Sequence, residues 1–225
     1  MKLRTQKKRN ELTQHLNDPL YKNAYFLMLS SVTSAGAGFF FWLIVARFYS
    51  TEEVGLASAI IAAMGLISMF SLLGFDISLV RFLPEREDKN ELINSCLTIS
   101  FIFSLALILI FIAGISIWSP SLSIIRENKF LLLLFVLFTA AASLTNLQIG
   151  GVFVGFRKTE YVFVQNIAIL VRIVIVPFLV AFGAFGIYVS YGLTPILAFV
   201  LGIFLISIVI PRSSAAVGTN RSSNF

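Results

Sequence analysis

Six long apolar runs, separated by short polar and charged segments, limit what this chain can fold into more than any other feature. About 20 apolar residues of helix cross a hydrocarbon core of about 30 Å, and each run reaches that length. Backbone groups in lipid must be hydrogen-bonded internally, so each run is predicted to be helical. The predicted spans are residues 24–46, 54–80, 97–118, 130–156, 161–183 and 185–210. The sequence therefore predicts an all-α polytopic membrane protein with six transmembrane helices in one bundle.

The composition excludes several other classes of protein. Apolar residues make up 58% of the chain and charged residues 12%, against about 45–50% and about 25% in a soluble domain. One Cys and one His are too few for a disulfide scaffold, a zinc site or a thiol enzyme. The chain also lacks paired intramembrane acids and a glycine-rich phosphate loop followed by Lys, so we expect no enzyme and no cofactor. The basic residues lie between apolar runs and do not form one exposed face, which argues against a nucleic-acid partner.

The basic residues also predict the orientation in the membrane. With the amino terminus inside, 13 Lys and Arg residues fall on the cytoplasmic side and only 3 outside. Such a bias is the usual sign of cytoplasmic loops. We therefore expect both termini in the cytoplasm, with a basic tail over residues 1–23, a transmembrane lobe over 24–210 and a disordered tail over 211–225.

Arg172 is the most informative residue in the predicted spans. It lies 11 residues beyond Tyr161, which places it about 16 Å deep. A charge at that depth costs at least about 2.5–3.5 kcal/mol in lipid and generally faces a bundle interior or a wet cavity. Pro177 leaves the carbonyl of Ile173 without its helical donor, next to Arg172. Gln165, seven residues before Arg172, shares its helix face. The alternative is an arginine with a purely structural role.

Three other polar residues lie within predicted spans. Asn146 and Gln148 fall about 12–15 Å from the cytoplasmic end of the fourth span, where they either line a cavity or bond neighbouring helices. Asp76 is shallower, about 7 Å into the apolar zone of the second span. We expect it either to pair with a cation on another helix or to act as a transport-related acid. The candidate cations are Arg157, Lys158 and Arg172.

Two stretches, residues 41–85 and 155–186, resemble a known family. The segments ARFYSTEEVG, SLVRFLPE and GFRKTEY are similar to loops in the amino-terminal half of polysaccharide biosynthesis proteins. These are lipid-linked oligosaccharide flippases of the multidrug/oligosaccharidyl-lipid/polysaccharide exporter superfamily. The resemblance implies translocation of lipid-linked oligosaccharide or polysaccharide precursors across the plasma membrane. It also implies that basic cavity residues, here Arg172 and Arg47, engage the pyrophosphate of the lipid carrier.

Members of that family have two six-helix lobes around a central cavity, and the likeness covers one lobe. The implied partners are therefore a lipid-linked glycan, membrane lipid, and a second six-helix lobe or another copy of this chain. One alternative is a drug or small-molecule exporter of the same superfamily, for which Asp76 is the candidate cation site. The other is a truncated, non-transporting lobe that acts as a membrane assembly partner.

Overall fold

A computed structural model describes residues 19–221 of the chain, and the side chains of residues 21–208. All regular structure in these residues is helical, which confirms the all-α prediction. The elements are α2 (Pro19–Phe48), α3 (Thr51–Phe70), α4 (Phe75–Phe82), α5 (Lys89–Trp118), η1 (Pro120–Leu122), α6 (Ile124–Glu127), α7 (Lys129–Leu147), η2 (Gln148–Phe153), α8 (Thr159–Ile167), α9 (Ile169–Ile175), η3 (Val176–Phe182) and α10 (Ala184–Arg221).

Six segments are long and apolar enough to cross a membrane, as predicted. They are Tyr21–Phe48, Thr51–Phe70, Lys89–Trp118, Lys129–Phe153, Thr159–Phe182 and Ala184–Ile208. The third span begins at Lys89, eight residues before the expected start at 97. Its first turns are polar and lie outside the apolar run, but they are helical. At the other end of the chain, α10 continues past the expected end at 210 as far as Arg221. Residues 1–18 and 222–225 of the two expected tails lie outside the described residues, and the division into tail, lobe and tail stays a prediction.

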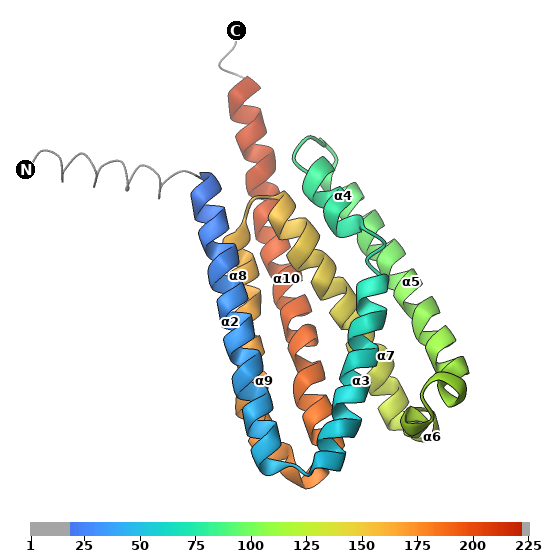
Figure 1. The fold of residues 1–225 in the computed structure, drawn as a ribbon. Coiled ribbons are helices and arrows are strands. Elements are labelled where there is room, and N and C mark those ends of the chain that lie inside the picture. Colours follow the sequence, from blue (N-terminus) through green and yellow to red (C-terminus); the bar gives the residue numbers. More distant parts are fainter. Residues whose placement is uncertain (1–18, 222–225) are drawn as a thin grey trace, which may run out of the picture.

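The second span is not the single helix expected over residues 54–80. Helix α3 ends at Phe70, and the chain turns through residues 71–74 before α4 begins. Leu73 and Gly74 both have positive φ, of 50° and 78°. Glycine adopts this conformation at little cost, whereas leucine does not. The turn that contains Leu73 is closed by backbone hydrogen bonds from Leu73 N to the carbonyl of Phe70 and from Phe75 N to the carbonyl of Leu72. The break directs α4 away from the axis of α3 (Figure 1).

The fourth and fifth spans also depart from regular α-helix. The fourth ends as the π-helix η2, whose Gly151 approaches α4 so closely that an added Cβ would lie 2.9 Å from the side chain of Leu79. The fifth changes to the 3₁₀-helix η3 at Val176, just before Pro177. Proline cannot donate the i−4 hydrogen bond, which explains why the α-helix ends there. The spans keep their length but are not straight rods.

Helices α7 and α10 form the centre of the bundle (Figure 1). Helix α2 packs against α8 and α9 on one side, and α5 covers α7 on the other. Because lipid is as apolar as the side chains, tight packing holds such helices together. Gly192 of α10 shows this: an added Cβ would lie 1.9 Å from the ring of Phe138 on α7.

The turn between α2 and α3 fastens one end of the lobe. Ser50 and Glu53 form a reciprocal capping box at the start of α3, which satisfies backbone donors of the first turn. The buried Tyr49 hydroxyl donates a hydrogen bond of 2.7 Å to the carbonyl of Val176. Burial raises the pKa of Tyr49, and the nearby Glu53 raises it further. The hydroxyl therefore remains a donor at neutral pH and ties this turn to the start of η3.

Candidate functional site

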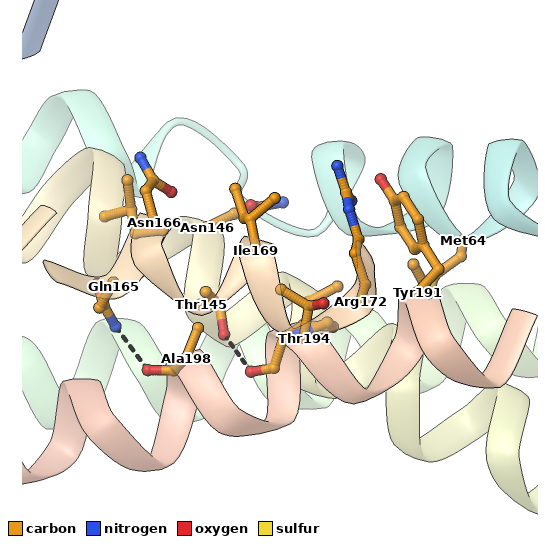
Figure 2. Close-up of a pocket in the computed structure, with 13 residues that line it drawn as sticks. Met64, Thr145, Asn146, Gln165, Asn166, Ile169, Arg172, Tyr191, Thr194 and Ala198 are labelled. Carbon is orange, nitrogen blue, oxygen red and sulfur yellow. Dashed lines mark hydrogen bonds between the residues drawn. The ribbon is translucent and has the colours of Figure 1, made fainter. Parts of the chain in front are cut away.

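A pocket of about 150 Å³ lies inside the lobe, and most of its walls come from spans four, five and six. Its polar lining comes from α7, α8, α9 and α10 (Figure 2). Met64 of α3 and Ile149 of η2 add apolar surface. The polar lining residues are Thr145, Asn146, Gln165, Asn166, Arg172, Tyr191 and Thr194.

Arg172 lies near the middle of its span and is only 8% exposed. This burial confirms that it faces the protein interior and not lipid. The guanidinium carbon lies 4.9 Å from the ring centre of Phe41 on α2 and 4.7 Å from that of Tyr191 on α10. Aromatic faces attract such a cation. Figure 2 shows the guanidinium beside the ring of Tyr191.

No acidic side chain among the described residues pairs with Arg172. The salt bridges of the described part of the chain join Glu160 to Lys22 at 3.0 Å and to Lys158 at 3.8 Å, at one end of the bundle. The buried Nε atom of Arg172 also has no hydrogen-bond partner there. Within the described residues no carboxylate therefore offsets its positive charge, and an anion in the pocket is the partner that its donors fit.

Gln165 and Gln148 form a buried amide pair behind the pocket wall. Gln165 Nε2 donates to Gln148 Oε1 at 3.1 Å and to the carbonyl of Ala198 at 2.7 Å. Gln165 lines the pocket, as its shared helix face with Arg172 predicts. Gln148 is fully buried and does not line it, so its position fits the helix-bonding alternative.

Two asparagines from different helices line the pocket: Asn146 lies on α7 and Asn166 on α8. Asn146 Nδ2 donates to Ser68 Oγ of α3 at 3.4 Å, and Asn146 remains exposed. Asn166 Nδ2 bonds Ser30 Oγ of α2. The sequence reasoning did not single out Asn166; its only signal was a polar side chain next to Gln165 in an apolar span.

Two expected site residues lie elsewhere. Asp76 packs on η2, with Oδ2 3.9 Å from the position of an added Cβ at Gly150, and it does not line the pocket. The predicted ion pair of Asp76 with another helix is wrong for the described residues, because none of their salt bridges includes it. Arg47 is exposed at the end of α2, away from the pocket lining.

The pocket therefore combines one cation with neutral hydrogen-bonding groups. Arg172 and the ring of Tyr191 lie toward one end of the row of lining residues, and Gln165 toward the other (Figure 2). Gln165 lies seven residues earlier, about 10 Å along the helix axis. Such a lining suits an anionic group joined to a hydroxyl-rich or amide-bearing one. Within the described residues, no group of three or more His, Cys, Asp or Glu side chains could hold a metal ion.

Comparison with known proteins identifies the family. No curated protein and no solved structure matches the chain. The sequence profile of a family described as polysaccharide biosynthesis protein matches residues 20–220. The match covers all six membrane-spanning segments and the whole pocket. The chain therefore belongs to the polysaccharide biosynthesis protein family.

Proposed function

We propose that this protein is a flippase-type transporter that moves lipid-linked oligosaccharide or polysaccharide precursors across the plasma membrane. Family membership and the six membrane-spanning segments support a transport role in polysaccharide biosynthesis. The observation that carries the proposal is Arg172, a buried cation near mid-membrane without an acidic partner among the described residues. Its placement on a polar pocket wall suits an anionic headgroup.

Arg172 is suited to the diphosphate of a lipid carrier. The planar guanidinium can donate two parallel hydrogen bonds to phosphate oxygens. The ring centres of Phe41 and Tyr191 lie 5.9 Å apart, so both rings contact the guanidinium from neighbouring directions and do not enclose it. In this mechanism the sugar lies against the amides and hydroxyls of the pocket, the prenyl tail stays in lipid, and rocking of lobes alternates access.

We further propose that a second six-helix lobe, or a second copy of this chain, completes the cavity. Asn146 supports this, because it is exposed in the isolated lobe about 10 Å from the nearer end of its span. A polar side chain facing acyl chains at that depth is unfavourable, so a polar cavity or a partner is its expected neighbour. Both termini are proposed to lie in the cytoplasm, on the basis of the charge distribution.

The test is rescue of glycan export in a flippase-deficient host. We expect rescue when the chain is co-expressed with a second six-helix half or assembles with its own copies. Arg172→Ala should weaken rescue more than Arg172→Lys, which keeps the charge but loses the two-pronged donor. Arg126→Ala, at an exposed arginine of the short helix α6, is the matched control.

Two outcomes would contradict parts of this proposal. Rescue by a demonstrably monomeric chain would refute the need for a partner lobe. Rescue that persists in Arg172→Ala would refute the claim that Arg172 binds the phosphate. The variant Asp76→Asn distinguishes the flippase from the drug-exporter alternative. We expect it to keep glycan export, because Asp76 does not line the pocket. A cation exporter that uses this carboxylate would lose its activity.

A further inference from the structure

The amide of Gln165 is held in one orientation. Its Nε2 donates to the backbone carbonyl of Ala198 at 2.7 Å. A carbonyl oxygen only accepts hydrogen bonds, so the nitrogen and not the oxygen of Gln165 must face it. The second hydrogen of Nε2 goes to Gln148 Oε1. Both donors of the amide are thus used, and Oε1 is fixed as an acceptor.

This acceptor has no donor within the described part of the protein. Gln165 is 1% exposed, and its Oε1 is a buried oxygen without a hydrogen-bond partner there. Gln148 Nε2, the remaining donor of the amide pair, is also without a partner and does not bond this oxygen. Leaving such a group unsatisfied costs about 1–3 kcal/mol. Because Gln165 lines the pocket, a donor on a ligand in the pocket would satisfy this oxygen.

The surrounding residues hold the Gln165 amide in place. Gly202 of α10 lies directly beside the amide pair: an added Cβ would be 2.1 Å from Gln148 Oε1 and 2.3 Å from Gln165 Nε2. Side chains of any size at this position would displace the pair. Gln148 touches no pocket space itself, so it acts as a positioning residue for Gln165.

Two further unpartnered polar atoms belong to the same pocket. Arg172 Nε is a buried donor and Thr194 Oγ1 is a buried hydroxyl, and both residues line the pocket with Gln165. Arg172 calls for an anion, whereas Gln165 Oε1 calls for a neutral donor such as a hydroxyl or an amide N–H. The two residues lie about 10 Å apart along the helix axis and line the same pocket, so a phosphate joined to a single sugar ring is of a suitable length to contact both.

We propose that Gln165 is a specificity-determining residue whose Oε1 accepts a hydrogen bond from a hydroxyl or N–H of the sugar attached to the phosphate bound at Arg172. This rests on the proposed function. It predicts that the pocket distinguishes a sugar-bearing prenyl diphosphate from the same lipid without its sugar. Arg172 supplies affinity for both lipids, and Gln165 supplies the difference between them.

The experiment compares two probes, farnesyl diphosphate and farnesyl diphosphate carrying one glucose, on the full chain in lipid nanodiscs. We expect wild-type protein to bind the glucose-bearing probe about tenfold more tightly, as one hydrogen bond to an otherwise unpaired buried acceptor allows. Gln165→Met keeps the length of the side chain but removes the acceptor and the two hydrogen bonds that Nε2 donates. It should reduce the preference to within about twofold and leave affinity for farnesyl diphosphate unchanged. Gln148→Met should give an intermediate preference.

Farnesyl diphosphates that carry a glucose lacking one hydroxyl repeat the test on wild-type protein. The wild-type result does not depend on whether a variant folds. Loss of one particular hydroxyl should weaken binding to the wild type about tenfold and leave Gln165→Met unaffected. The proposed role of Gln165 would be overturned by either of two results. One is an equal loss of affinity for farnesyl diphosphate and for its glucose-bearing form in Gln165→Met. The other is a wild type that binds both probes equally tightly. Failure of the wild type, assembled with a second lobe or with its own copies, to bind either probe would instead overturn the proposed function, and with it this inference.

Discussion

Replacing Arg172 with methionine should make the lobe more stable and abolish transport. A mid-membrane arginine costs at least about 2.5–3.5 kcal/mol. Two aromatic contacts, at 4.9 Å and 4.7 Å, each return about 0.5–1 kcal/mol. The remaining penalty is about 0.5–2.5 kcal/mol, because no acidic partner among the described residues offsets it. Methionine fills similar space and carries no charge, so it removes this penalty.

At about 2–4 °C per kcal/mol for a chain of this size, the melting temperature should rise by about 1–10 °C. The assay is thermal unfolding of purified protein in nanodiscs without ligand, followed by tryptophan fluorescence and by retention of the monodisperse peak. Arg126→Met, at an exposed arginine, is the matched control and should change the melting temperature by less than about 2 °C. A fall of several degrees in Arg172→Met would show that the arginine is structural and refute the reasoning.

Three more predictions follow from the packing and the charges. Gly202→Ala should lower the melting temperature, since its Cβ would overlap the glutamine amides, whereas Gly65→Ala, with nothing within 4 Å, should leave it unchanged or higher. Tyr49→Phe should destabilise the lobe by about 0.5–1.5 kcal/mol at neutral pH. Because the pKa of Tyr49 is raised, its contribution is complete below about pH 10 and is lost as the pH rises through the folded-state pKa. The stability gap between wild type and Tyr49→Phe should therefore close in alkali, and a gap independent of pH would contradict the assignment. Reporter fusions at Lys89 and Lys158 should give a cytoplasmic signal, and a fusion at Glu127 an external one. An external signal at Lys89 or Lys158 would overturn the predicted orientation.

The number and type of the spans could be predicted because lipid leaves the backbone few choices. An apolar run of sufficient length must form a helix, and the structure has all six. The breaks within spans could not be predicted in this way. The positive φ of Leu73 occurs in a turn where Phe75 N bonds the carbonyl of Leu72, and the π-helix η2 lies where Gly151 closely approaches Leu79. Hydropathy carries no information on either contact.

The part of the site that comes from a single membrane span could be predicted from the sequence. Seven residues separate Gln165 from Arg172, and helical periodicity alone places both on one wall. Contacts between residues of different helices could not be predicted from the sequence. Gln148 accepts a hydrogen bond from Gln165, and Asp76 packs against Gly150 instead of a cation. The burial cost of Asp76 is visible in the sequence, whereas the neighbour that covers it depends on the fold.

Translocation itself tests the central claim most directly. A fluorescent prenyl diphosphate carrying one sugar is placed in proteoliposomes, and its transfer between leaflets is followed by quenching from outside. We predict transfer by wild-type protein assembled with a second lobe or its own copies, a large loss with Arg172→Ala, and a smaller loss with Arg172→Lys. Equal transfer by wild type and Arg172→Ala would contradict the claim that this buried cation binds the diphosphate. Absence of transfer in every assembly would contradict the flippase function.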